Sequence, residues 1–191
     1  SRKPGAKIIF DVKCSSLLPK DISEHGGEPI MSRTGHSFIK NKLKETDAEL
    51  GGEMSGHIFF KDRWYGFDDA LYTAARLLEI ISKTDKTCAE IFAELPGSVS
   101  TPEINIHFDE QGQQYDAMEV LSNSVDFPGA EINTIDGVRV DYENCWGLVR
   151  ASNTTPCLVL RFEGNDKEAL DSIKSQFKDW LETNNISTKT L

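Results

Sequence analysis

The spacing of apolar and polar residues in the first half of the chain predicts short strands alternating with helices. A run with β-branched and aromatic bias predicts a buried strand over 7–12, and further short strands are predicted over 28–32 and 58–60. Apolar residues at helical spacing predict helices over 17–25, 38–45, 67–82 and, more weakly, 87–95. The helix over 67–82 has one apolar stripe, which we expect to pack in the core and which consists of Phe67, Leu71, Ala74, Leu78 and Ile81.

The pattern changes after residue 102 to short strands with two helices. Strands are predicted over 103–108, 132–135, 138–142, 146–149 and 157–162, and a helix over 113–124. Asp136-Gly137 predicts a two-residue hairpin turn. Asn165 followed by Glu168 is a capping-box pattern, which predicts the start of a last helix. The predicted buried face of that helix is Leu170, Ile173, Phe177 and Leu181.

These patterns predict two domains of different class. Residues 1–97 are expected to form an α/β domain, a mixed sheet with flanking helices. Residues 98–191 are expected to form an α+β domain, an antiparallel sheet with helices on one side. The stretch 96–102 contains two prolines and a glycine, so we expect it to be the hinge between the domains.

Composition narrows the class of partner. Acidic residues outnumber basic ones, 31 against 21, which argues against nucleic acid or an anionic membrane surface as a partner. The longest apolar runs fall far short of the roughly 20 residues that a membrane span needs. None of the four cysteines is in a Cys-x-x-Cys pair, so we interpret them as thiols in a reducing, cytoplasmic compartment. The chain opens without Met and runs directly into a strand, as expected for a piece of a longer protein.

Residues 51–57, Gly-Gly-Glu-Met-Ser-Gly-His, are the most informative stretch for function. Glycines on both sides allow positive φ and close approach to a ligand. Between them Glu53 and Ser55 offer hydrogen-bond acceptors, and Ser55 and His57 offer donors. We expect this loop to bind a polyhydroxylated small molecule. Half of a metal site at Glu53 and His57 is a weaker reading, because no third ligand follows at a suitable offset.

A second polar loop covers residues 150–155, Arg-Ala-Ser-Asn-Thr-Thr, between two predicted strands. Arg150 would supply charge and a bidentate hydrogen bond to a phosphate. Short neutral donors would complete the site, namely Ser152, Asn153, Thr154 and Thr155. A polar turn that hydrogen-bonds only to its own backbone explains the same residues about equally well.

Two further residues are candidates on position alone. Lys13 lies just past the carboxyl end of the first predicted strand, where α/β sheets bind ligands. His36 follows a glycine at a turn and precedes a helix. A solvated lysine and a surface or capping histidine are the simpler readings of these two residues.

Five motifs together resemble the α-D-phosphohexomutase superfamily, and specifically its bacterial phosphomannomutase/phosphoglucomutase branch. They occur in order along the chain: Asp11-Val12-Lys13-Cys14, Thr34-Gly35-His36-Ser37, Gly52-Glu53-Met54-Ser55-Gly56-His57, Gly66-Phe67-Asp68-Asp69 and Arg150-Ala151-Ser152-Asn153-Thr154-Thr155-Pro156. The glucosamine branch usually has Gln where this chain has Met54, and a Gly-Thr-Glu type core in its phosphate loop. Met54 and the Thr154-Thr155 pair therefore favour glucose and mannose phosphates, although a phosphoglucosamine mutase fragment stays an alternative.

The resemblance implies an enzyme of four domains, of which this chain matches only the third and fourth. Such an enzyme interconverts hexose 1-phosphate and hexose 6-phosphate through an enzyme phosphoserine and a glucose or mannose 1,6-bisphosphate. Its phosphoserine loop and its Asp-x-Asp-x-Asp loop for Mg²⁺ belong to the missing N-terminal domains. We therefore expect no metal ligands and no nucleophile here, and no activity of this chain alone.

The resemblance also implies a role for each candidate residue. Glu53, Ser55 and His57 would recognise the sugar. The phosphate that does not react would be held by Arg150, Ser152, Asn153, Thr154 and Thr155. Lys13 and His36 would neutralise charge or assist proton transfer near the reacting phosphate. The alternatives from other classes are a non-catalytic sugar-phosphate-binding module and a structural or regulatory fragment.

Overall fold

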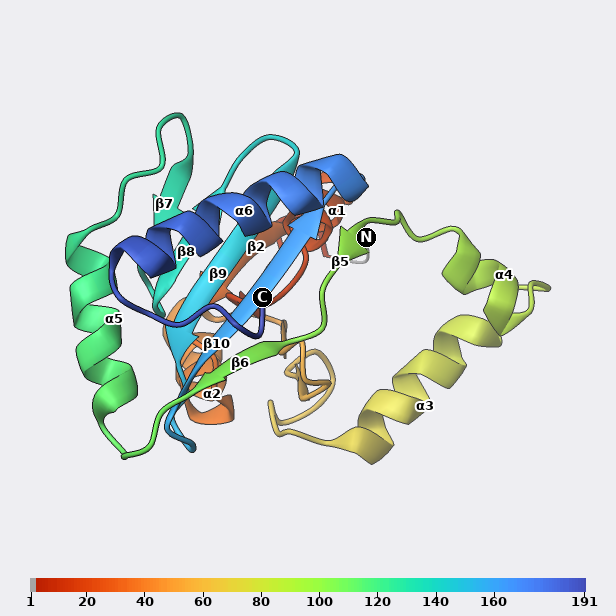
Figure 1. Ribbon diagram of the computed structural model, residues 1–191. Coiled ribbons are helices and arrows are strands. Elements are labelled where there is room, and N and C mark those ends of the chain that lie inside the picture. The colour runs from red at the N-terminus through yellow and green to blue at the C-terminus, as the bar shows by residue number, and fades with distance from the viewer. Residues whose placement is uncertain (1–2) are drawn as a thin grey trace. The chain divides into compact units, whose positions relative to one another are not determined.

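The computed structural model describes residues 3–191 and divides the chain into two compact units (Figure 1). The first unit extends to Pro96 and the second begins at Gly97. The first contains a mixed sheet with helices, and the second an antiparallel sheet with helices. This confirms the predicted sequence of an α/β domain followed by an α+β domain.

The sheet of the first unit has the strand order β2-β1-β3-β4. Its strands are β1 (Lys7–Asp11), β2 (Glu28–Ser32), β3 (Leu50–Gly52) and β4 (Ile58–Phe60). Strand β1 is parallel to both β2 and β3, whereas β4 is antiparallel to β3. The carboxyl ends of β1, β2 and β3 therefore meet at one edge of the sheet, where α/β proteins bind ligands.

Helices α1 (Leu17–Glu24) and α2 (His36–Thr46) pack on this sheet through opposite faces of β1. Ile9 belongs to a buried cluster with Ile39 of α2, and its neighbour Phe10 to a second cluster with Ile22 of α1. Adjacent strand residues point to opposite faces, so the two clusters lie on the two sides of the sheet. The sequence pattern placed Gly51 in a ligand loop, but it lies in β3, where an added Cβ would come 2.7 Å from the Ile39 side chain. This glycine permits close packing of α2.

The apolar stripe predicted to be buried is exposed, and that prediction is wrong. Helix α3 (Ala70–Ile81) and the short α4 (Cys88–Ala93), both labelled in Figure 1, come after β4 in the chain, and neither contains a buried residue. Leu71 is 86% exposed and Leu78 is 64% exposed. The helix instead contacts Phe60 of β4 through Tyr72 and through the guanidinium of Arg76. Helical spacing identifies an apolar face, but it does not determine whether the described residues supply a surface to cover it.

The second unit is a six-stranded antiparallel sheet in the order β5-β10-β9-β8-β7, with β6 also paired to β10. Its strands are β5 (Val99–Ser100), β6 (Ile104–His107), β7 (Glu131–Asn133), β8 (Val138–Asp141), β9 (Cys145–Ala151) and β10 (Cys157–Gly164). Its helices are α5 (Gln113–Asn123) and α6 (Lys167–Thr183).

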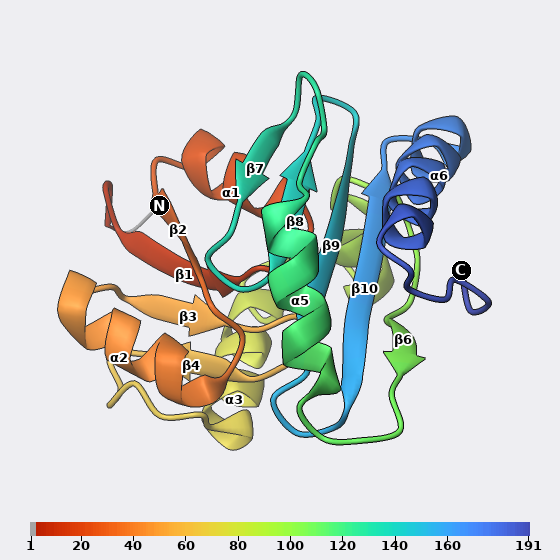
Figure 2. The same cartoon turned by 60° about the vertical axis from the view of Figure 1, so that its left-hand side comes forward.

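Both helices lie beside the sheet of the second unit (Figure 2). One apolar core joins them to it. Phe177 of α6 is fully buried at its centre, and its ring contacts those of Phe127, Phe162 and Trp180. The predicted inner face of α6 is confirmed, since Leu170, Ile173, Phe177 and Leu181 are all buried.

The boundary between the two units falls after Pro96, inside the stretch 96–102 that was expected to be the hinge. The later residues of that stretch belong to the second sheet, since β5 pairs with β10 and the backbone N–H of Thr101 donates to the carbonyl of Phe162. One local prediction differs from the structure in this unit. The helix cap is Asp166 and not Asn165, because the Asp166 carboxylate accepts a hydrogen bond from the backbone N–H of Ala169. Both residues are good caps, and only the backbone geometry selects between them.

Candidate functional site

Three loops converge at the carboxyl edge of the first sheet. Residues 12–16 follow β1, residues 33–35 follow β2, and residues 53–57 connect β3 to β4. Because these three strands are parallel to one another, their loops lie side by side at the same edge. These loops contain Lys13, Glu53, Ser55 and His57, and His36 begins helix α2 directly after the second loop. These are the five candidates that the sequence placed in this unit.

A buried carboxylate ties these loops together. Asp11 is fully buried, and one of its oxygens accepts from the backbone N–H of Met54 at 3.2 Å. Its other oxygen accepts from the hydroxyl of Thr34 at 3.2 Å. Asp11 therefore holds the loop of residues 53–57 and the loop of residues 33–35 in a fixed arrangement. Sequence reasoning gave Asp11 no role of its own, because nothing in its local pattern indicates which loops it bonds to.

Glu53 connects the same loops from the other side. Its side chain is nearly buried, and one carboxylate oxygen accepts from the backbone N–H of Gly35 at 2.6 Å. The other oxygen accepts from the hydroxyl of Ser55 at 3.2 Å. A carboxylate has about four acceptor positions, so these bonds leave capacity for a ligand hydroxyl. Glu53 is thus preorganised and not free to swing.

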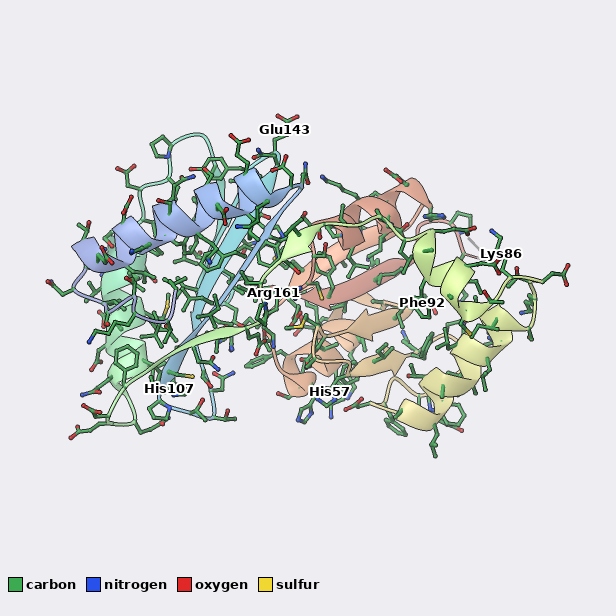
Figure 3. The ribbon with its side chains drawn as sticks, turned by 45° about the vertical axis from the view of Figure 1, so that its right-hand side comes forward. His57, Lys86, Phe92, His107, Glu143 and Arg161 are labelled. Carbon is green, nitrogen blue, oxygen red and sulfur yellow. The ribbon has the colours of Figure 1, made fainter. Side chains whose placement is uncertain are left out.

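The remaining candidates of this unit differ in exposure. Lys13 is buried, whereas His36, Ser55 and His57 are exposed. The rings of His36 and His57 lie 6.4 Å apart, centroid to centroid, and His57 is visible at the edge of the unit (Figure 3). The Nδ1 atom of His57 lies 2.6 Å from a carboxylate oxygen of Asp68. The structure therefore gathers imidazoles, a carboxylate and a hydroxyl at one edge.

The sequence placed Arg150 in a loop of the second unit. In the structure it lies near the end of strand β9. Its Nε–H donates to a carboxylate oxygen of Asp136 at 2.9 Å, and both side chains are buried. The sequence had assigned Asp136 to a two-residue hairpin turn. The loop is longer, because Asn133 is the last residue of β7 and pairs with Arg139. The extra length lets Asp136 reach Arg150.

Gly137 has a requirement of its own beside this ion pair. Its φ is +82°, and an added Cβ would come 2.2 Å from the carbonyl oxygen of Val149 and 2.7 Å from the Cα of Arg150. Any side chain would thus collide with the backbone that carries the guanidinium. The Asp-Gly pair fits here because Asp136 supplies the ion pair and Gly137 leaves room for it.

Residues 152–155 form a turn organised by one buried hydroxyl. The Ser152 oxygen accepts from the backbone N–H groups of Thr154 and Thr155, at 3.3 and 3.2 Å. It also lies 2.9 Å from the hydroxyl of Thr155. The side chains of Asn153, Thr154 and Thr155 are exposed around it. The self-bonded turn and the ligand-binding loop are therefore compatible, since the turn presents its outer groups to solvent.

Arg150 has donor capacity that the described residues leave unused. Its Nη2 atom is buried and has no hydrogen-bond partner among residues 3–191. An unsatisfied buried donor costs about 1–3 kcal/mol and needs an explanation. A guanidinium beside a hydroxyl-rich turn is suited to an oxyanion with several acceptor oxygens, such as a phosphate monoester.

Within residues 3–191, no group of three His, Cys, Asp or Glu side chains is placed to hold a metal ion. No disulfide joins the four cysteines, all of which lie in that range. No described helix is long and apolar enough to cross a membrane.

The first unit thus gathers hydrogen-bonding side chains at one sheet edge, and the second has a buried arginine with an unpaired donor atom beside a hydroxyl-rich turn. Comparison with known families gives two matches. Residues 1–99 match the phosphoglucomutase/phosphomannomutase α/β/α domain III, and residues 103–179 match the C-terminal domain of the same family. The chain belongs to the phosphoglucomutase/phosphomannomutase family, within the phosphohexomutase superfamily, and corresponds to its third and C-terminal domains.

Individual relatives agree. The chain is 56% identical over 181 residues to a phosphomannomutase/phosphoglucomutase of Pseudomonas putida, covering 95% of this chain and 39% of that protein. It is 55% identical over 185 residues to a phosphoglucomutase of Neisseria meningitidis, covering 96% of this chain and 40% of that protein. A crystal structure of a family protein from Burkholderia thailandensis superposes with a TM-score of 0.89 at 50% identity, covering 96% of this chain and 39% of that one. The chain thus spans about two fifths of the length of these relatives.

Proposed function

We propose that this chain supplies the sugar and phosphate recognition of a phosphomannomutase/phosphoglucomutase that interconverts hexose 1-phosphate and hexose 6-phosphate. The observation that carries the proposal is the buried, ion-paired Arg150, whose Nη2 atom has no partner beside the turn of Ser152. Phosphate oxygens would accept from this guanidinium and from the exposed donors of Asn153, Thr154 and Thr155. This phosphate is the one that does not react.

The loop of the first unit would recognise the sugar. Glu53 and Ser55 would bond to neighbouring hydroxyls, and His57 would contact the same ring. The fixed positions of Glu53 and of the loop it holds support this role, because binding remote from the reacting atoms orients the substrate at little entropic cost. Names of the relatives at 54–56% identity favour glucose and mannose phosphates over glucosamine phosphates.

Near the reacting phosphate, Lys13 and His36 would neutralise charge or assist proton transfer. The serine nucleophile and the ligands of Mg²⁺ would belong to parts of the longer protein outside this chain, as would the turnover of a hexose 1,6-bisphosphate. The proposed setting is the cytoplasm. Alone, the chain would bind hexose phosphates weakly and would not convert them.

Titration of the chain with glucose 6-phosphate, followed by calorimetry or by NMR shifts, tests the phosphate assignment. We expect Arg150→Ala to lower the affinity at least tenfold, since a hydrogen bond to a charged group is worth about 1.5–3 kcal/mol. Arg150→Lys keeps the charge but loses the bidentate geometry, and we expect an intermediate affinity. Equal affinities for the native chain and Arg150→Ala would refute the assignment.

Arg139→Ala is the matched control. Arg139 is also buried in the second sheet, but it pairs with Asp141 and lies over the ring of Trp146. Loss of Arg139 would disturb the same sheet but would leave the proposed phosphate-binding guanidinium of Arg150 in place. The affinity of the folded variant for glucose 6-phosphate is therefore expected to stay unchanged. A separate assay with glucose 1-phosphate is expected to detect no turnover by the chain. Measurable turnover would mean that it has its own nucleophile.

A further inference from the structure

We infer that Asp68 is a positioning residue that fixes the proton of His57 on Nδ1, so that Nε2 is the acceptor presented to the sugar. The inference deepens the proposed function and rests on it for the identity of the ligand. It assigns a task to a residue that sequence reasoning quoted only as part of the Gly66–Asp69 motif.

The backbone brings the two side chains together from loops eleven residues apart. His57 directly precedes β4, and residue Phe59 of that strand forms an antiparallel bridge with Asp68. Gly66, with a φ of +73°, turns the chain back toward the strand. The position of Asp68 beside His57 is therefore set by strand pairing and not by the side chains alone.

The distance of 2.6 Å between Nδ1 of His57 and Oδ2 of Asp68 is that of a short, charge-assisted hydrogen bond. An ionised carboxylate only accepts, so the proton of this bond belongs to Nδ1. In a neutral imidazole the other nitrogen, Nε2, then carries the lone pair. A histidine whose Nδ1–H is held in this way keeps one tautomer and one ring orientation, as in other sites where a carboxylate orients an imidazole.

This arrangement contributes little to stability, which separates positioning from a structural role. The side chains of His57 and Asp68 are 49% and 37% exposed, and exposed ion pairs contribute little to folding. A free imidazole in water favours the opposite tautomer, with the proton on Nε2. Without Asp68, His57 would then present a donor where the ligand now meets an acceptor.

The test is a long-range proton–nitrogen correlation spectrum of the ligand-free chain with ¹⁵N-labelled histidine. The chain has four histidines, and a His57→Gln variant identifies the signal of His57. At a pH where the ring is neutral, we expect the Nδ1–H pattern for His57 in the native chain and the Nε2–H pattern in Asp68→Ala. Asp47→Asn is the control, because Asp47 pairs with Lys61 in the same unit and not with a histidine. An Nε2–H pattern in the native chain, or an unchanged pattern in Asp68→Ala, overturns the inference.

Binding gives the second measurement. Asp68→Ala is expected to weaken glucose 6-phosphate binding about fivefold, the value of one ordinary hydrogen bond, and to match the loss in His57→Gln. A tautomer change with unaltered affinity would refute the role in sugar recognition. Failure of the native chain to bind any glucose 6-phosphate would instead refute the proposed function, since the spectrum is recorded without sugar.

Discussion

The ion pair between Asp136 and Arg150 offers a direct test of how this fold supports the proposed phosphate site. Both side chains are buried, with 8% and 6% of their surfaces exposed, and they meet at 2.9 Å. Removing one partner of a buried pair leaves an uncompensated charge, which typically costs about 3–5 kcal/mol of unfolding free energy. We expect this cost for Asp136→Ala. Asp136→Asn keeps an acceptor for Nε but loses the charge, so we expect about 1–2 kcal/mol.

A double-mutant cycle isolates the pair. Asp136→Ala together with Arg150→Ala leaves no buried charge, so the double variant is expected to be more stable than the sum of the single effects by about 2–3 kcal/mol. Unfolding in urea, followed by tryptophan fluorescence, measures each variant. In a Trp64→Phe background the two remaining tryptophans, Trp146 and Trp180, report the second unit alone.

Glucose 6-phosphate extends the same assay to function. Its phosphate would replace the lost acceptor of Arg150, so the stability gap between Asp136→Ala and the native chain is expected to narrow as the ligand is added. A coupling below about 0.5 kcal/mol would refute the reasoning, because it would mean that the pair acts as two independent groups. A stability gap between Asp136→Ala and the native chain that stays constant up to saturating glucose 6-phosphate would also refute the reasoning.

Three further predictions concern packing and exposure. Phe177→Ala should destabilise the second unit by about 3–5 kcal/mol in the same urea assay, because its fully buried ring contacts three other aromatic rings; a cost below about 1 kcal/mol would contradict the fold. Leu71→Ser should change the unfolding free energy by less than about 0.5 kcal/mol, since Leu71 is 86% exposed, and should reduce binding of a hydrophobic dye. A large loss of stability would show that α3 packs elsewhere. Iodoacetamide should alkylate the exposed Cys88 before Cys145, because burial raises the pKa of the Cys145 thiol above its ordinary value of 9.0 and the thiolate is the nucleophile. The raised pKa also means that stability falls as the pH rises past that ordinary value, an effect that Cys145→Ser should remove.

Local patterns were sufficient wherever neighbouring residues decide the outcome. Helix α6 has its predicted inner face, because apolar spacing over 17 residues and burial against one sheet agree. The boundaries were less certain. Asp166 caps this helix although Asn165 has an equally suitable side chain, and the choice depends on the backbone that leaves β10.

The local sequence pattern could not predict contacts between residues that are far apart in the chain. Asp136 fitted a hairpin turn by its sequence neighbours, and its ion pair with Arg150 exists because β8 and β9 are adjacent in the sheet. The role of Asp11 depends on the parallel arrangement of β1, β2 and β3, which brings their loops together, and the local sequence does not show it. The prediction for α3 failed for a different reason. Its helical period shows that one face is apolar, but it does not show that other described residues cover that face.

The sequence by itself determined the two-domain organisation expected from its patterns and the class of each domain, and it supplied the candidate residues for a sugar-phosphate site. These features depend on residue type and on short-range spacing, and both can be read directly from the sequence. Only the tertiary structure decided how those residues are held: Glu53 by Gly35, His57 by Asp68, and Arg150 by Asp136. Each of these contacts joins segments between 11 and 18 residues apart, so strand order and register, and not local propensity, place the atoms.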